Sequence, residues 1–156
     1  MKLKNKVAVI TGGAGGIGKT IVETFIGEGA RIAVADTNIS ELENSDKTKI
    51  LAIKTDISDV TDVKNLIKKT LSRYGSIDIL VNVAGIQKPI GPLVKTDTND
   101  WIKNIYVNLI GTMLCCKTVL PIMISNKKGK IINFSGGGAT FPRPNYSAYA
   151  SSKAAI

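Results

Sequence analysis

The sequence of 156 residues contains no histidine and only two cysteines. Without histidine, Ser–His–Asp and Cys–His nucleophiles are excluded, so acid–base chemistry must come from tyrosine, lysine or carboxylates. The cysteines, Cys115 and Cys116, are neighbours within an apolar helical pattern. Adjacent cysteines cannot form an ordinary disulfide, and two ligands do not make a zinc site. We therefore expect core or helix-surface residues there, and no metal.

Long apolar runs are also missing. No stretch reaches the roughly 18 consecutive apolar residues of a membrane span, and the run at 7–10 is too short for the core of a signal peptide. The composition, 44% hydrophobic and 21% charged, is that of an ordinary globular domain. We expect a single domain over 1–156, located in the cytoplasm and without a membrane partner.

The net charge of +9 is of the kind found in nucleic-acid-binding proteins. The lysines, however, lie mostly at the ends of predicted elements and in turns, without interleaved aromatic residues. The residues concerned are Lys2, Lys4, Lys6, Lys47, Lys49, Lys68, Lys69, Lys127, Lys128 and Lys130. This pattern indicates a solvated surface, so we expect no nucleic-acid partner.

The most informative stretch is TGGAGGIG at 11–18, which lies between an apolar run and a helical pattern. Glycines let a backbone approach a phosphate closely, and a helix N-terminus offers free N–H groups. The same letters fit two motifs. The residues 13–20 satisfy G-x-x-x-x-G-K-S/T, the loop that binds ATP or GTP. Gly12, Gly16 and Gly18 satisfy T-G-x-x-x-G-x-G, a relative of the dinucleotide-binding fingerprint.

Apolar runs alternate with helical patterns along the chain, which predicts a parallel sheet with helices on both faces. Strands are expected at 7–10, 31–35, 50–54, 77–83 and 129–134. Helices are expected at 17–26, from a cap at Ser58 or Asp59 to 74, at 98–125 with a bend at Pro121, and from 147. The segment 37–49 is a polar connection that can hold a short helix. The fold class is α/β, a Rossmann-type doubly wound sheet of order 3-2-1-4-5.

Asp36 and a Tyr–Lys pair add chemistry to this frame. Asp36 ends the second strand, about 20 residues beyond the loop, where a carboxylate accepts hydrogen bonds from an adenosine ribose and repels a 2′-phosphate. Gly15, rather than a basic residue, stands in the loop. Both features favour NAD over NADP, with a turn role as the alternative for Asp36.

Tyr149 and Lys153 share a helix face, where an ammonium favours the phenolate and makes the tyrosine a usable acid–base group.

In their order, these motifs resemble the N-terminal part of a short-chain dehydrogenase/reductase. The matching residues are TGGAGGIG at 11–18, Asp36, Asp56-Ile57, N-V-A-G at 82–85, Asn108 and Y-A-S-S-K at 149–153. Together they span the whole chain. The resemblance makes the ATP-binding loop a minor alternative.

The resemblance implies a role for each matching residue. It assigns Gly12, Gly16, Ile17 and Gly18 to the NAD diphosphate, Asp36 to the adenosine ribose, Asp56 and Ile57 to the adenine, and Asn82, Ala84 and Gly85 to the cofactor's flank. It makes Tyr149 the group that exchanges a proton with the substrate. It also implies that Lys153 binds the nicotinamide ribose and that Asn108 holds a water linking Lys153 to solvent. A satisfied core amide is the alternative for Asn108.

The chain departs from the family pattern in three ways. Val83 replaces the second Asn of N-N-A-G, with a small expected effect. The position of the family's catalytic Ser falls on Gly136, one residue after Ser135. Either the loop bulges so that Ser135 serves, or the hydroxyl is missing or comes from Ser147 or Thr140. Relatives also continue past Ile156, so we interpret the chain as truncated, lacking the last strands of the family fold.

The leading hypothesis is an NAD-dependent oxidoreductase that interconverts a secondary alcohol and a ketone on a small sugar-like or acyl substrate. The alternatives are a dinucleotide-binding module with little or no catalysis and, as a minor one, a P-loop nucleotide hydrolase. Turnover by the truncated chain is expected to be poor or absent. A complete chain is expected to form a homodimer or homotetramer through the helices that begin near Thr98 and Ser147.

Overall fold

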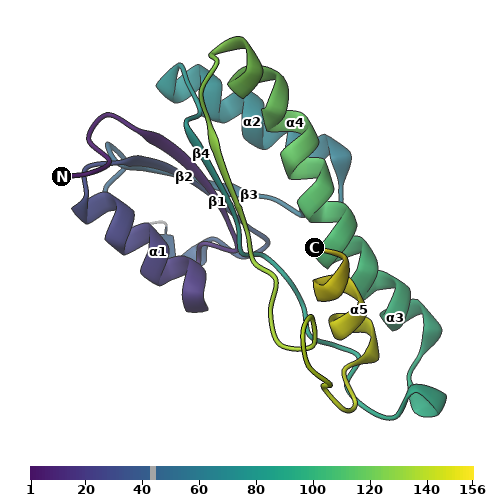
Figure 1. Cartoon of the computed structure of the whole chain (residues 1–156). Coiled ribbons are helices and arrows are strands. Elements are labelled where there is room, and N and C mark those ends of the chain that lie inside the picture. Colours follow the sequence, from purple (N-terminus) through teal and green to yellow (C-terminus); the bar gives the residue numbers. More distant parts are fainter. Residues whose placement is uncertain (43–44) are drawn as a thin grey trace.

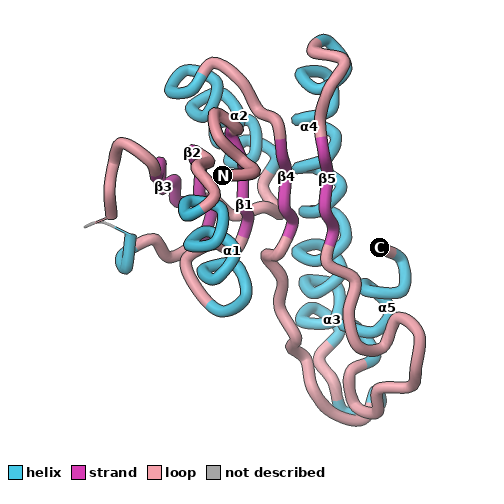
Figure 2. The backbone as a smooth tube through the Cα atoms, turned by 60° about the vertical axis from the view of Figure 1, so that its left-hand side comes forward, coloured by secondary structure: helices cyan, strands magenta, loops and turns pink. Residues whose placement is uncertain are grey.

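A computed structural model of the chain, which describes residues 1–42 and 45–156, contains a five-stranded parallel sheet. The strands are β1 (Val7–Thr11), β2 (Arg31–Asp36), β3 (Ile50–Lys54), β4 (Ile79–Asn82) and β5 (Lys130–Asn133). Their order is β3-β2-β1-β4-β5, which confirms the order predicted from the sequence and is visible in Figure 2. The last two strands are shorter at both ends than the apolar runs suggested.

Helices cover both faces of the sheet (Figure 1). α1 (Gly16–Gly27) covers one face, and α2 (Val60–Tyr74) and α4 (Gly111–Ser125) cover the other. Every residue of β1 is buried, and its side chains alternate between the two cores: Ala8 and Ile10 pack with Val22 of α1, whereas Val9 packs with Leu66 of α2. Burial on both faces explains the uninterrupted apolar run of this central strand.

The ends of α2 follow from local chemistry. The Asp59 side chain accepts hydrogen bonds from the backbone N–H groups of Thr61 and Asp62, at 2.6 and 3.1 Å. This places the cap at Asp59 rather than Ser58. The helix ends where Gly75 adopts a left-handed conformation, φ 78°.

The polar connection after β2 contains a short 3-10 helix, η1 (Ser40–Leu42). The prediction of a short helix there is thus confirmed for these residues. Positions 43–44 of the same connection lie outside the described residues.

The long helix predicted at 98–125 is continuous but not uniform. It consists of α3 (Thr98–Ile105), a π-helical turn (Tyr106–Ile110) and α4, and it follows a short 3-10 helix, η2 (Leu93–Lys95). The apolar periodicity predicted the helix and its ends but not the π-turn. Pro121 lies inside α4.

By length and mean hydropathy, 1.7 over its most apolar window, this helix is apolar enough to cross a membrane. A search for consecutive apolar residues does not detect a helix of this kind. A core helix of a soluble protein passes the same test, which makes length and composition weak support for a span. Here α4 packs on α2 and β4, and α3 packs on α5.

The last helix, α5 (Ser147–Ala155), lies beside α3 and the π-turn, beyond the carboxyl end of β5 (Figures 1 and 2). The loop that links β5 to α5 contains the glycines at 136–138. The final helix therefore lies at the carboxyl ends of the strands, where the glycine-rich loop at 11–18 also lies.

Candidate functional site

The carboxyl ends of the parallel strands meet at one edge of the sheet. The register pairs Thr11 with Ala35 and with Asn82, and Asn82 with Asn133. After β1 the chain runs to β2 and β3 on one side and then returns to β4 on the other. Ligands of open α/β sheets bind outside the strand ends at such a reversal of strand order. The predicted site residues therefore have a common place to gather, between β1 and β4.

The glycine loop at 11–18 fits closely against the segment that follows β4. Gly12 has φ 68°, and a Cβ atom added to it would lie 2.8 Å from the Ala84 Cα and N atoms. A Cβ atom on Gly18 would overlap the Gly12 carbonyl. Both positions thus require glycine because backbone segments approach each other there.

The N-terminus of α1 opens toward the same space. Its N-cap residue is Gly15, and no side chain caps the first turn. The first backbone N–H groups of a helix have no partner within the helix. With the positive end of the helix dipole, they form a site that suits a phosphate group.

A cavity of about 710 Å³ lies at this place, within the size range of ligand sites. Its lining residues are Gly12, Gly15, Gly16, Ile17, Ala35, Asp36, Thr37, Thr55, Asp56, Ile57, Val83, Ala84, Gly85, Ile86, Gln87, Lys103 and Val107. They come from the ends of β1 to β4 and from the long helix. The structure thus brings most of the predicted cofactor-binding residues to one cavity.

Asp36 stands at the rim of this cavity. Its carboxylate accepts hydrogen bonds from the backbone N–H groups of Ala14, at 3.2 Å, and Asn38, also at 3.2 Å. The first bond ties the end of β2 to the glycine loop and fixes the position of the negative charge.

Asp56 accepts hydrogen bonds from the backbone N–H and the hydroxyl of Ser58, at 2.9 and 2.6 Å. One of its carboxylate oxygens is therefore used within its own turn.

Tyr149 and Lys153 lie on one face of α5. The Lys153 Nζ atom is 5.7 Å from the centroid of the Tyr149 ring and donates a hydrogen bond to the Phe134 carbonyl at 2.7 Å. Lys153 is only 5% exposed. Burial lowers its pKa from the ordinary value, because the charged form loses hydration.

Gly85 connects this pair to the cavity. A Cβ atom on Gly85 would lie 3.0 Å from the Asn108 Oδ1 atom and 3.9 Å from the Lys153 Nζ atom. The cavity wall formed by Gly85 is therefore backed directly by Lys153 and Asn108. A larger residue would separate the cavity from the lysine.

Asn108 lies in the π-turn with its side chain fully engaged. Its Oδ1 atom accepts from the Ile86 backbone N–H at 2.8 Å, and its Nδ2 atom lies within hydrogen-bond distance of the Ile86 carbonyl, the Asn104 Oδ1 atom and the Ser152 hydroxyl. The side chain joins the end of β4, α3 and α5. These contacts fit the alternative interpretation, a satisfied core amide. The water that would link Lys153 to solvent stays a prediction.

The structure does not join Ser135 to the tyrosine. Its hydroxyl donates to the Lys153 carbonyl at 3.1 Å. A Cβ atom on Gly136 would instead lie 2.9 Å from the Tyr149 hydroxyl. Position 136 therefore faces the tyrosine and carries no side chain, which fits the alternative of a missing hydroxyl better than a bulge that lets Ser135 serve. Ser147 accepts a hydrogen bond from the Trp101 indole at 3.1 Å.

The structure also differs from the prediction at Asn82. This residue is 3% exposed and does not line the cavity. Its Nδ2 atom donates to the Asn133 Oδ1 atom at 2.9 Å, while its own Oδ1 atom is buried without a partner among the described residues. Because side chains alternate between the two faces of a sheet, the Asn82 side chain lies on the face that α4 covers, where its Nδ2 atom also contacts the Cys116 Sγ atom at 3.4 Å. Asn82 thus links the two strands.

The ATP-binding interpretation of the loop is not supported by the position of Lys19. Its Nζ atom pairs with the Glu41 carboxylate at 3.0 Å, and both side chains are exposed. The lysine of an ATP-binding loop must reach the terminal phosphates. Here the lysine is paired with η1 instead.

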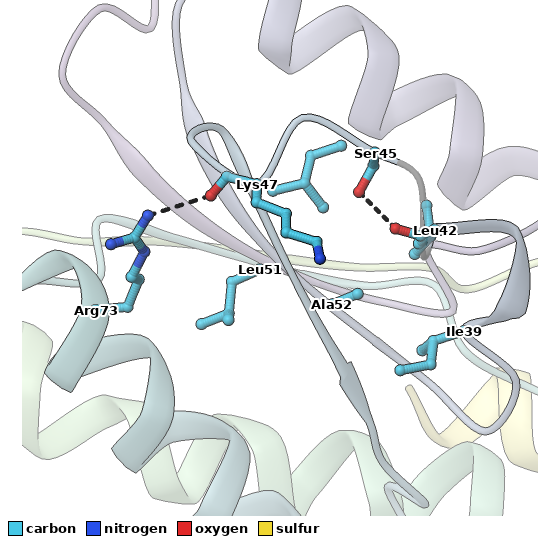
Figure 3. A pocket seen from close by; sticks show the side chains of 8 residues that line it. Ile39, Leu42, Ser45, Lys47, Leu51, Ala52 and Arg73 are labelled. Carbon is cyan, nitrogen blue, oxygen red and sulfur yellow. Dashed lines mark hydrogen bonds between the residues drawn. The ribbon is translucent and has the colours of Figure 1, made fainter.

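A second cavity, of about 700 Å³, lies beside β3 at the outer edge of the sheet (Figure 3). Its lining includes Ile39, Leu42, Lys47, Leu51 and Arg73, and the Arg73 guanidinium donates to the Lys47 carbonyl at 3.2 Å. None of the predicted site residues lines it. We therefore place the functional site in the cavity between β1 and β4.

Several residues of the site were not found from the sequence. Lys103 and Val107 line the cavity from the long helix, and Asn104 donates to the Ile86 and Lys88 carbonyls, at 3.0 and 2.7 Å. Asn104 and Asn108 are four residues apart in the long helix. That spacing was a usable signal for a shared polar contact.

Comparison with known proteins supplies independent evidence. The model of the short chain dehydrogenase family matches residues 6–156. A short chain dehydrogenase from Pseudocercospora fijiensis is 38% identical over 99% of this chain and 52% of its own length. Secoisolariciresinol dehydrogenase from Forsythia intermedia is 34% identical over 99% of this chain and 58% of its own length.

Solved structures agree with the sequence relatives. The crystal structure of NAD⁺-bound xylitol dehydrogenase superposes with a TM-score of 0.94 at 28% identity, over 100% of this chain and 62% of that chain. The chain thus spans between 52% and 62% of the length of these three proteins. Because the family model covers nearly the whole chain and the sheet has the order that the resemblance implied, the chain belongs to the short chain dehydrogenase family of oxidoreductases.

Proposed function

We propose that the protein is an NAD-dependent oxidoreductase that interconverts a secondary alcohol and a ketone. The observation that carries the proposal is the position of Gly85. One side of this residue lines the cavity at the glycine loop, and the other lies against Lys153 and Asn108. A cofactor site and a tyrosine–lysine pair are therefore in contact.

The residues present fit a dinucleotide. The cradle at Gly12 and Gly18 and the uncapped start of α1 suit the diphosphate. The Asp36 carboxylate suits the two hydroxyls of an adenosine ribose and repels a 2′-phosphate, which favours NAD over NADP. Asp56 and Ile57, from the turn after β3, would flank the adenine.

The chemistry is divided between the cofactor and α5. When bound, the nicotinamide ring supplies or accepts the hydride. In the direction of reduction, the Tyr149 hydroxyl donates its proton to the carbonyl oxygen of the substrate, and in oxidation the phenolate takes it back. Lys153 places its amino group 5.7 Å from the centre of the Tyr149 ring.

A specific observation also favours the second candidate, a dinucleotide-binding module with little catalysis. No side chain occupies position 136 at the Tyr149 hydroxyl, and the Ser135 hydroxyl is bonded to the α5 backbone. A substrate oxygen would then be oriented by Tyr149 without a neighbouring hydroxyl. This candidate predicts normal cofactor affinity with weak turnover.

The remaining parts of the proposal concern partners and location. We propose a small-molecule substrate, and a homodimer or homotetramer that buries exposed apolar side chains of the long helix. Met113, Leu120 and Ile124 of α4 are such side chains. Both cysteines are free thiols, which suits the reducing cytoplasm.

Cofactor binding tests the assignment first. We expect saturable NADH binding in a fluorescence titration, with weaker binding of NADPH. Asp36→Ala should lower NADH affinity by about tenfold or more, the value of a hydrogen bond to a charged group, and should remove the preference over NADPH. Glu28→Gln, at the opposite end of α1, is the matched control and should leave both affinities unchanged. ATP–magnesium binding without NADH binding would overturn the proposal in favour of the ATP-binding loop.

Turnover separates the two leading candidates. The oxidoreductase proposal expects NAD(H)-dependent conversion of small alcohols or ketones that is lost in Tyr149→Phe, while NADH affinity stays the same. Unaltered turnover in Tyr149→Phe would contradict the role of the tyrosine. NADH binding without turnover on any substrate tried would favour the binding module.

A further inference from the structure

The Arg143 side chain lies between two tyrosine rings beside the proposed reaction centre. Its guanidinium carbon is 3.9 Å from the Tyr146 ring centroid and 4.9 Å from the Tyr149 ring centroid. The two rings are edge-on, with centroids 6.4 Å apart. Stacking on aromatic rings holds the plane of a guanidinium and leaves its N–H edge available for a further partner.

The charge of Arg143 is not balanced by the protein around it. Arg143 forms no salt bridge and its guanidinium no hydrogen bond with any residue in 1–42 or 45–156. The sequence from Trp101 to Ile156 contains no aspartate or glutamate at all. The same stretch carries Lys103, Lys117, Lys127, Lys128, Lys130, Arg143 and Lys153. A half-buried guanidinium in such a region has a strong electrostatic preference for an anion.

The guanidinium and the tyrosine hydroxyl both lie beside the loop that contains the glycines at 136–138. A Cβ atom on Gly136 would lie 2.9 Å from the Tyr149 hydroxyl, and one on Gly137 would lie 3.6 Å from an Arg143 Nη atom. The guanidinium carbon lies 4.9 Å from the centre of the Tyr149 ring, so an anion bound by Arg143 would be held close to the tyrosine. Because positions 136 and 137 are both glycine, neither adds a side chain beside these two groups.

We propose that Arg143 binds the anionic group, carboxylate or phosphate, of a small substrate whose hydroxyl or carbonyl reacts at Tyr149. This inference rests on the proposed function and names its substrate class: hydroxy or keto acids, or hydroxyalkyl phosphates. The guanidinium edge matches the two oxygens of such a group in a bidentate contact. The anion then orients the reacting carbon beside the tyrosine hydroxyl.

The test uses the 156-residue chain without dinucleotide, so that it does not depend on the cofactor assignment. Arginine side-chain and tyrosine ring signals are followed by NMR while lactate, glycerol 3-phosphate or neutral propane-1,2-diol is added. We expect saturable shifts at Arg143, Tyr146 and Tyr149 with at least one anion and none with the diol. The anion that binds identifies the group as carboxylate or phosphate.

Variants separate binding from packing. Arg143→Gln should weaken anion binding at least about tenfold. Arg143→Lys keeps the charge but lacks the planar guanidinium, so it should weaken anion binding less. Arg73→Gln is the matched control because Arg73 also lies over a tyrosine ring, that of Tyr74, at 5.9 Å. It should change nothing at Tyr149.

Two results would overturn the proposal: no saturable shift with either anion, or equal anion affinity in Arg143→Gln and the unaltered chain. A lower melting temperature of Arg143→Gln without any anion effect would give Arg143 a packing role only. Failure of the proposed function is seen separately, as absent NADH binding, and leaves the anion titration interpretable.

Discussion

At the scale of single residues, the site depends on where backbone segments come into contact. Gly12 and Gly15 are both in the glycine loop, yet of the two only Gly12 lies against the backbone of Ala84, in the segment that follows β4. A motif match treats all its glycines alike. The structure separates those that are needed for close approach from those that are not.

We predict that Gly12→Ala is destabilising and Gly15→Ala is not. At Gly12 the added Cβ atom would meet the Ala84 backbone at 2.8 Å with φ 68°, and the strained conformation alone costs about 1–2 kcal/mol. At Gly15 no atom lies within 4 Å of the added Cβ. Thermal unfolding followed by circular dichroism should show a Tm lower by roughly 2–8 °C for the first variant. Equal melting temperatures for the two variants would contradict the close contact with the Ala84 backbone.

At the scale of elements, the π-turn is what ties the long helix to the site. The turn at Tyr106–Ile110 presents Asn108 to the end of β4 and to α5. Single-turn π-helical insertions are often found at functional sites. Here the insertion lies beside the tyrosine–lysine pair, so the geometry of α5 depends on a side chain of another helix.

We predict that Asn108→Ala is strongly destabilising. The substitution leaves the Ile86 N–H and the Asn104 Oδ1 atom without their partner, at a cost of about 2–4 kcal/mol for buried unpaired groups. Urea denaturation measures the change in the free energy of unfolding. Asn126→Ala, at the exposed end of α4, is the control and should stay within about 0.5 kcal/mol. A similar, small change in both variants would contradict a joining role for Asn108.

At the scale of the whole molecule, the long helix has an outer face with little to cover it. Met113, Leu120 and Ile124 are exposed along α4 at spacings of seven and four residues, which places them on one helix face. The opposite side of α4 packs on α2 and β4. An exposed apolar stripe of this kind indicates a contact with another chain.

We predict self-association through this face of α4. Leu120→Lys puts a charge where an apolar contact is expected and should shift sedimentation equilibrium toward the monomer. Val94→Lys is the control, because Val94 is more exposed than Leu120, 92% against 41%, but lies in η2. A monomeric unaltered chain, or an equal effect of both variants, would contradict the prediction.

The sequence by itself determined the element order, the sheet order, the glycine loop and the pairing of Tyr149 with Lys153. These features depend on local periodicity and on spacings within one element, which a sequence displays directly. Their agreement along the chain also sufficed to indicate the family.

Only the tertiary structure decided which side chains face the site. It placed Gly136 rather than Ser135 at the Tyr149 hydroxyl, turned Asn82 toward β5 and brought Arg143 between two rings. Each outcome is set by contacts between segments apart in the chain, such as that of Asn82 with Asn133 and that of Ser135 with the Lys153 backbone. Local periodicity carries no record of such contacts.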